Sequence, residues 1–232
     1  GVKPILGAEV RIANPKQPAQ PFRALLLIRN HSGYVRLGEL LTLAHTDEYR
    51  DLIAPQLQEE WLVEGDNSGL ICLSGAQWGE IGQALLAGHE EQALQAAQKY
   101  AAWFEQAFYL EVQRLPDKPE WETVVAGSVR LAEQLDLPVV ATHATQFLQR
   151  EDFTAHDARV CIAGGWVLAD DKRPHDFSDS QYFARPEEMA ERFADLPAAL
   201  ANSLEIAKRC NVELELGKNF LPDFPTPEGM PL

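Results

Sequence analysis

The side chains that most often bind metals or act as nucleophiles, histidine and cysteine, are scattered along this sequence. Four of the six histidines have no carboxylate or cysteine at metal-ligand spacing, and these are His31, His45, His89 and His175. The three cysteines, Cys72, Cys161 and Cys210, are far apart, which favours neither a disulfide framework nor a CxxC metal motif. We expect the four histidines at the surface or at helix ends. Cys72 lies in an apolar segment and is expected in the core.

Two further groups of charged residues have structural interpretations. His156 and Asp157 lie in a helical run, where a helix cap or a surface pair is expected. Asp170, Asp171 and Arg173 stand next to a proline and predict a turn held by local ion pairs. We therefore predict no catalytic residue from these patterns.

The chain is acidic, with 35 Asp and Glu against 20 Lys and Arg and a formal net charge of -15. This negative field repels phosphate backbones, so direct DNA binding by the chain is not expected. With 232 residues, 46% of them hydrophobic, the chain can bury a core. No apolar run approaches the roughly 20 residues that cross a bilayer, so we expect a protein of the reducing cytoplasm without membrane contact. The five tryptophans lack basic neighbours suited to base stacking and are expected to anchor the core or an interface: Trp61, Trp78, Trp103, Trp121 and Trp166.

Hydrophobic periodicity predicts strands alternating with helices. Strands are expected over residues 5–12, 24–28, 70–73, 108–113 and 139–142. Helices are expected over residues 33–46, 55–61, 79–87, 90–104, 121–135, 152–163, 186–194 and 197–210. Asn30 or Ser32 could cap the first helix, and Pro55 is placed in the first turn of the second. The first two strands are expected to be adjacent and buried, and the later alternation is typical of a parallel α/β sheet or barrel.

Several segments, read in order, carry a resemblance to a known family. They are GVKPILGAE at 1–9, NHSGY at 30–34, LICLSG at 70–75, LPVVAT at 137–142, AHD at 155–157, DDKRP at 170–174, AKRCN at 207–211 and FLPDFP at 220–225. Together they resemble the PHP domain of the alpha subunit of bacterial DNA polymerase III, of the proteobacterial type.

The resemblance implies a distorted (β/α)7 barrel of the PHP type at the amino-terminal side of a polymerase palm. Residues 1–219 are then a partial PHP domain, and the Pro-rich residues 220–232 are a linker toward the palm. The barrel is expected to be incomplete because its first strands, with the His-x-His motif of the family, precede Gly1, which makes the chain an amino-terminally truncated fragment. The nucleotide-adding aspartates and their magnesium belong to the palm, so no cofactor is expected in this chain.

The resemblance also supplies the positions of the family's metal ligands, which this sequence has mostly replaced. Glu9 is retained as a vestigial ligand, or it is a buried carboxylate paired with Arg23 on the next strand. The degenerate positions are Arg23 and Gln146 in place of histidines, Ala76 in place of a cysteine and Ala144 in place of an aspartate. Arg114 and Leu115 stand where another histidine is supplied by metal-binding relatives. An arginine is always charged and cannot bind a metal.

His143 occupies the slot beside Ala144 and is expected to face the wrong way along an alternating strand to replace a ligand. With about one ligand where a metal cluster needs several, hydrolysis is expected to be weak or absent. The resemblance therefore favours a structural module that supports the palm and docks the proofreading exonuclease subunit, with DNA reached only through the parent polymerase.

Two other functions remain open. One is a metal-dependent phosphoesterase or 3'-5' proofreading exonuclease, as in polymerase relatives with complete ligands. The other is an unrelated α/β barrel enzyme such as a sugar isomerase, which strand and helix alternation alone would permit. A barrel without its first strands would also expose a sheet edge, which predicts self-association of the isolated piece.

Overall fold

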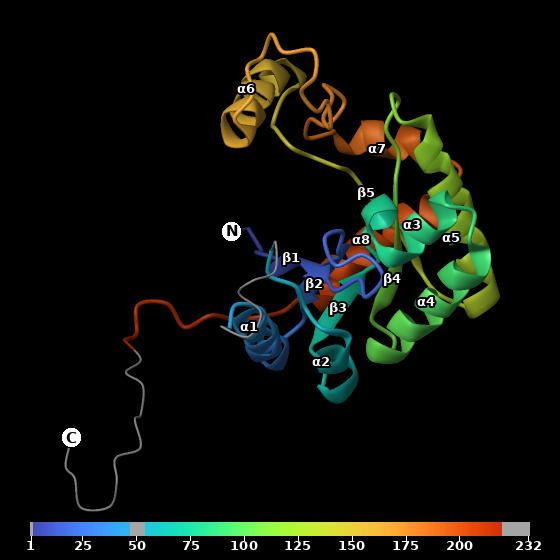
Figure 1. Ribbon diagram of the computed structural model, residues 1–232. Helices are drawn as coiled ribbons and strands as arrows, with labels where there is room; N and C mark the ends of the chain where they lie inside the picture. The colour runs from blue at the N-terminus through green and yellow to red at the C-terminus, as the bar shows by residue number, and fades with distance from the viewer. Residues whose placement is uncertain (1, 47–53, 220–232) are drawn as a thin grey trace, which may run out of the picture.

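The computed structural model describes residues 2–46 and 54–219, and its centre is a five-stranded sheet with the strand order β1-β2-β3-β4-β5 (Figure 1). The strands are β1 Gly7–Ile12, β2 Phe22–Ile28, β3 Leu70–Leu73, β4 Phe108–Gln113 and β5 Val139–Thr142. β1 and β2, and β2 and β3, pair antiparallel, whereas β3, β4 and β5 run parallel. The α/β class is confirmed, and the sheet is consistent with an incomplete (β/α) barrel.

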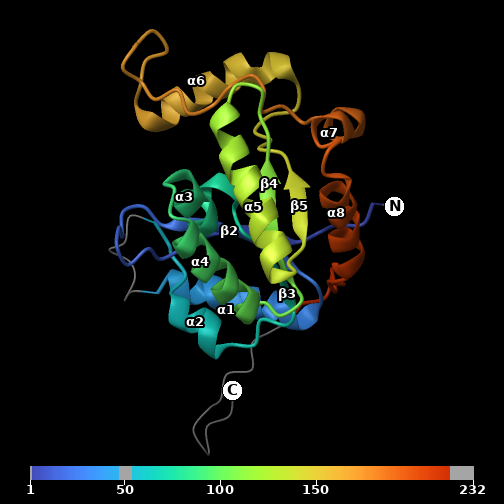
Figure 2. The same ribbon diagram turned by 90° about the vertical axis from the view of Figure 1, so that its right-hand side faces the viewer.

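The parallel half of the sheet is built by helical crossovers. β3 leads through α3 (Glu80–Leu86) and α4 (Glu90–Trp103) into β4, and α5 (Glu122–Leu135) connects β4 to β5. α5 packs against β4, while α8 (Pro197–Arg209) packs beside β5 (Figure 2). The inner face of α5 is buried through Val124, Val125, Leu131 and Ala132, and Val129 is half-buried. Parallel strands joined in this way bring their carboxyl ends to one edge of the sheet.

The antiparallel half is covered by α1 (His31–Ala44), and here one predicted cap is confirmed. The side chain of Asn30 accepts a hydrogen bond from the backbone N–H of Gly33 at 3.1 Å. Of the apolar residues that recur at helical spacing here, Leu37, Leu40 and Ala44 are buried on the inner face of the helix, and Leu41 is half-buried. The predicted burial of both first strands is wrong for β1, because β1 is the edge of the sheet and its residues alternate between buried and exposed.

The predicted helix over 55–61 is also wrong in its position. α2 runs over Glu59–Glu64, and Pro55 precedes it in an extended segment. The reason is that Leu57 pairs with the end of β1: its N–H donates to the carbonyl of Arg11, and its own carbonyl accepts from Ala13. These two backbone bonds compete directly with a helical turn.

A separate group of elements, residues 147–183, stands away from the sheet and is called the α6 lobe here. It contains α6 (Phe153–Gly164) and returns to the body at a bridge between Phe147 and Tyr182, after which α7 (Pro186–Arg192) leads into α8 (Figure 1). The predicted helix and following loop are confirmed here. The predicted linker over 220–232 lies outside the described residues.

One buried helical glycine permits the approach of α3 to the turn after β3. A Cβ atom at Gly82 would overlap the carbonyl oxygen of Ala76, whereas a Cβ at Gly38, exposed in α1, would meet nothing within 4 Å. We therefore expect Gly82→Ala to lower the free energy of unfolding by about 1–3 kcal/mol through overpacking. Gly38→Ala is the matched control and should raise the free energy of unfolding by about 0.5–1 kcal/mol through helix propensity. Urea unfolding followed by circular dichroism measures both, and equal effects would contradict this packing.

Candidate functional site at the carboxyl ends of the parallel strands

A pocket of about 260 Å³ opens where the parallel strands end. All five strands or the turns that follow them contribute to its lining, together with Trp78 and Gln181: Glu9, Arg23, Ala24, Leu25, Gly75, Glu111, Gln113, Thr142, His143, Ala144, Thr145 and Gln146. In open α/β sheets, ligands commonly bind at this edge. The pocket is therefore the place to test for metal or catalytic chemistry.

Four of the five positions that the family resemblance gives for metal ligands lie together in this pocket: Glu9, Arg23, Ala144 and Gln146. Ala76 does not line it and is 1% exposed behind Gly75. Metal clusters need several carboxylate, thiolate or neutral imidazole ligands. The methyl groups of Ala76 and Ala144, the amide of Gln146 and the guanidinium of Arg23 cannot supply such ligands. Within residues 2–46 and 54–219, no group of three His, Cys, Asp or Glu side chains could hold a metal ion.

Glu9, the one retained carboxylate, pairs with Arg23 as predicted. The Arg23 Nη1 lies 3.5 Å from Glu9 Oε1 across the β1–β2 pair, and the Arg23 guanidinium stands over the Trp78 ring at 5.4 Å. The predicted burial of this pair is wrong, because the side chains of Glu9 and Arg23 are 61% and 43% exposed. The arginine places a permanent positive charge at this position, where a cluster of metal cations would need anionic or neutral ligands.

A buried carboxyl group that the sequence reasoning missed lies beneath the pocket. Glu111, in β4, is 6% exposed and accepts hydrogen bonds from the Gly75 N–H at 3.1 Å, the Thr142 hydroxyl at 2.5 Å and the Gln113 amide at 3.4 Å. Burial raises the pKa of Glu111 against the opposing effect of these hydrogen bonds. The signal was present in the sequence, since Glu111 interrupts the apolar segment that forms a fully buried strand.

Glutamine side chains extend this network under the sheet. The Gln113 amide also donates to the Thr142 hydroxyl at 2.9 Å, and the Gln77 amide donates to the Gln113 carbonyl oxygen at 3.0 Å. The Gln77 carbonyl oxygen is buried without a hydrogen-bond partner. The network therefore joins the ends of β3, β4 and β5 through hydrogen bonds.

His143 lines the pocket, which corrects the prediction that it faces away. β5 ends at Thr142, so strand alternation no longer applies at His143. Its Nδ1 lies 2.8 Å from Arg192 Nη1 and must accept that hydrogen bond, because guanidinium groups only donate. Burial and the nearby Arg192 charge lower the pKa of His143. The imidazole is thus kept neutral and is held by α7.

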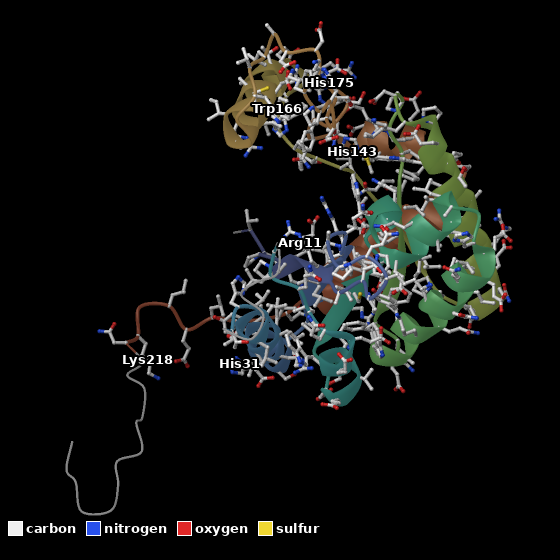
Figure 3. All side chains as sticks on the ribbon, viewed as in Figure 1. Arg11, His31, His143, Trp166, His175 and Lys218 are labelled. Carbon is white, nitrogen blue, oxygen red and sulfur yellow. The ribbon has the colours of Figure 1, made fainter. Side chains whose placement is uncertain are left out.

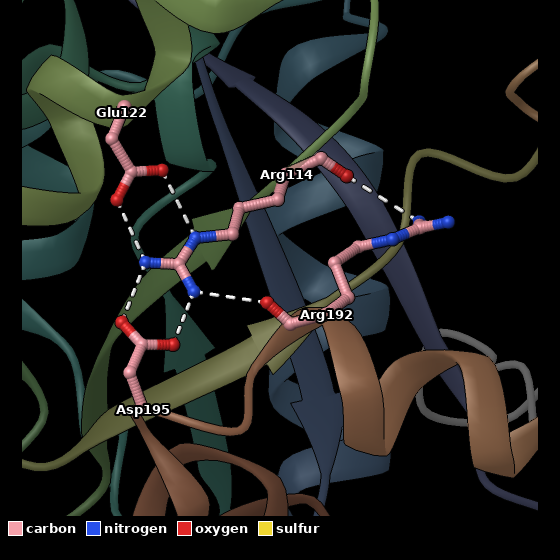
Figure 4. A network of polar contacts seen from close by, with 4 residues as sticks. All are labelled: Arg114, Glu122, Arg192 and Asp195. Carbon is pink, nitrogen blue, oxygen red and sulfur yellow. Dashed lines mark hydrogen bonds and ion pairs between the residues drawn. The ribbon is translucent and has the colours of Figure 1, made fainter.

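Arg114, the residue in place of a family histidine, has become a clamp between distant segments (Figure 4). Its guanidinium donates to both carboxylate oxygens of Glu122, at 2.7 and 3.0 Å, and to both of Asp195, at 2.5 and 2.9 Å. It also donates to the Arg192 carbonyl at 2.9 Å and stands over the Phe193 ring at 5.1 Å. The bonds to Arg114 lower the pKa of Asp195. This one side chain joins β4 to the start of α5 and to the α7–α8 connection.

The remaining predicted residues lie outside the pocket. The four scattered histidines are exposed, and three are at helix ends, so their prediction is confirmed: His31, His45, His89 and His175. Cys72 is buried in β3, as predicted. His156 is 5% exposed and packs between Phe147 and Phe177, so the surface pair is wrong.

The predicted turn over 170–174 is only partly held by local contacts. Asp170 accepts from the backbone N–H of Lys172, but Arg173 pairs with Asp157 of α6 at 2.7 Å instead of with its aspartate neighbours. Among the predicted tryptophan anchors, Trp121 is buried, whereas Trp166 is 41% exposed. In the part of the chain that the structure describes, no helix has the length and apolar character needed to cross a membrane.

Comparison with known proteins gives one consistent family. The sequence model described as "PHP domain" matches residues 1–115. The chain is similar to DNA polymerase III subunit alpha of Neisseria meningitidis serogroup A, with 65% identity over 100% of this chain and 20% of the relative. It is also similar to the protein of that name from Pseudomonas aeruginosa, with 45% identity over 99% of this chain and 19% of the relative. The protein of that name from Escherichia coli K12 is 41% identical over 97% of this chain and 19% of the relative. The chain thus spans about a fifth of the length of these relatives.

We expect the Arg114 clamp to make a measurable contribution to the free energy of unfolding. Arg114→Met should lower the free energy of unfolding by about 1–3 kcal/mol, because the Arg114 side chain is only 17% exposed and makes five hydrogen bonds, although its carboxylate partners Glu122 and Asp195 are 55% and 61% exposed. Arg130→Met is the control, since the Arg130–Glu90 pair is 58% and 72% exposed, and its loss should cost within about 1 kcal/mol. Chemical denaturation compares the two variants, and a loss at Arg130 as large as that at Arg114 would contradict the assignment.

The buried Glu111 carboxyl group should make stability depend on pH in a defined direction. Its pKa is raised in the folded state, so between the ordinary carboxyl pKa and the raised value the folded chain binds more protons than the unfolded chain. Stability contributed by this group therefore falls as the pH rises through that window. Glu111→Gln removes the titration, so the variant should gain stability relative to the wild type as the pH rises from the ordinary carboxyl pKa through the raised pKa of Glu111.

Urea denaturation at a series of pH values measures this difference. Glu60→Gln, which removes an exposed carboxylate on α2, is the control. Its free energy of unfolding should follow the same pH dependence as that of the wild type. A Glu111→Gln variant that loses relative stability as the pH rises would reverse the predicted sign.

Proposed function

This chain belongs to the PHP domain family of DNA polymerase III alpha subunits, and on that premise we propose that it acts in the polymerase as a non-catalytic structural and docking module. One observation carries the proposal. The pocket at the strand ends presents Arg23, Ala144 and Gln146 at positions where the family resemblance calls for metal ligands, with Glu9 already paired. Without several anionic or imidazole ligands, no cluster of ions is available to activate water.

The Glu111 and Arg114 networks support the structural part of this proposal. They connect the ends of three parallel strands to α5, α7 and the α7–α8 connection with hydrogen bonds between protein groups. A domain held in this way can carry neighbouring domains without bound metal. Nucleotide addition, with its magnesium, would belong to the palm of the complete subunit.

The docking part concerns the separate proofreading exonuclease subunit. The formal charge of -15 suits a protein partner better than a nucleic acid, so we propose that DNA is contacted by other parts of the polymerase. The free edge of β1 leaves the isolated chain open to self-association, which the complete subunit would suppress by covering that edge.

Excision of a mismatched primer end by the complete alpha subunit tests both parts. The subunit alone, with Mg²⁺ or Mn²⁺, should release no nucleotide above background, and Glu9→Ala should change nothing. Added exonuclease subunit should co-elute with the alpha subunit and restore excision. Excision by the alpha subunit alone that is abolished by Glu9→Ala would establish the rival phosphoesterase or exonuclease function. Failure of the two subunits to co-elute at micromolar concentration would remove the docking role.

A further inference from the structure

The α6 lobe exposes an apolar surface at the carboxyl end of its helix. Residues 162–169 have the sequence IAGGWVLA, without a charged or strongly polar side chain. Ile162 is 83% exposed and Val167 70%, and Trp166 and Leu168 are exposed beside them. We call these four side chains the α6 apolar patch. Figure 3 shows Trp166 in the lobe, away from the sheet.

The backbone under this patch is held in one conformation. Gly165 ends α6 in the left-handed region at φ 71°, and the N–H of Trp166 donates to the Cys161 carbonyl at 2.9 Å. The Val167 carbonyl accepts from the Asp170 N–H at 2.9 Å. Hydrogen bonds of this kind at a helix end fix the chain that follows. The exposed side chains are therefore presented by an ordered loop.

An ion pair beneath the loop adds to this order. Arg173 donates two hydrogen bonds of 2.7 Å to the carboxylate of Asp157, and a third of 3.2 Å to the Leu168 carbonyl. The Arg173 and Asp157 side chains are only 10% and 19% exposed. A bidentate pair shielded from water fixes geometry as well as charge. The lobe thus positions an apolar surface that has no partner inside the described residues.

The chemistry of the α6 apolar patch favours binding of a polypeptide over binding of a lipid surface or a nucleic acid. The net charge of the chain opposes anionic lipid surfaces and nucleic acids. A contiguous apolar surface rimmed by polar residues is typical of protein contacts, and permanent contacts have the more apolar centres. An uncharged run of eight residues fits the permanent kind.

We propose that the α6 apolar patch is covered by the remaining polypeptide of the same alpha subunit, an inference that rests on the proposed function. The Neisseria relative matches all of this chain at 65% identity, yet this match is 20% of its length. In a subunit of that kind, most of the polypeptide is tethered to this domain. A tethered segment reaches the patch at a high effective concentration, which favours it over a dissociable partner.

Thiol labelling in the complete alpha subunit tests the proposal. Val167→Cys places a thiol in the patch, and Thr154→Cys places one at the opposite end of α6, where the residue is exposed. The three native cysteines of this chain are buried, and mass spectrometry of the peptide that carries each new thiol separates it from the others. Primer extension confirms that each variant subunit is folded. The labelling rate is measured in the native subunit and again in urea.

The patch should be protected in the alpha subunit alone. Cys introduced at position 167 should react at least about tenfold more slowly in the native subunit than in urea, while Cys at position 154 should react at similar rates in both. Protection at both positions would extend the covered face along α6 and would support the proposal as well. Fast labelling at position 167 would overturn it, and so would protection that appears only when the exonuclease subunit is added. Neither result depends on metal binding, so failure here is distinct from failure of the proposed function.

Discussion

The buried carboxyl group of Glu111 is the constraint around which the strand-end pocket is arranged. A buried carboxyl group without hydrogen bonds costs about 1–3 kcal/mol or more, so its partners must be placed with care. They come from three consecutive parallel strand ends, with Gly75 after β3, Gln113 in β4 and Thr142 in β5. Satisfying this one group therefore aligns the three strands at the edge where ligands would otherwise bind.

Arginine side chains complete the same arrangement around the rim of the sheet. Arg23 neutralises Glu9 across the antiparallel pair, and Arg114 gathers Glu122, Asp195 and a carbonyl of α7. In the family resemblance both arginines stand where metal-binding relatives have histidines. A guanidinium group is a cation built into the chain, and it can bridge carboxylates with fixed geometry. Both arginines thus supply positive charge at this site from the protein itself.

Local patterns predicted the elements well, because strands, caps and helical faces depend on neighbouring residues. Asn30 was one of two candidate caps, and the Glu9–Arg23 pair followed from adjacent strands. The predictions failed where distant residues decide. Leu57 forms a β-bridge with Ile12 at the end of β1 instead of the predicted helical turn. Arg173 pairs with Asp157 of α6 instead of with its aspartate neighbours. The pairing of Arg114 with Asp195 could not be predicted from the sequence, because the two residues are 81 positions apart. Glu111 could have been found, because a glutamate in a buried strand requires partners.

We propose that protein groups, and not metal ions, organise the pocket at the strand ends. X-ray diffraction at the manganese absorption edge, from crystals of the complete alpha subunit soaked in Mn²⁺, tests this claim most directly. No anomalous peak is expected among Glu9, Arg23, Ala144 and Gln146, and Glu111 should still be hydrogen-bonded to Gly75 and Thr142. Two or three anomalous peaks in that pocket, with Arg23 displaced from Glu9, would contradict it.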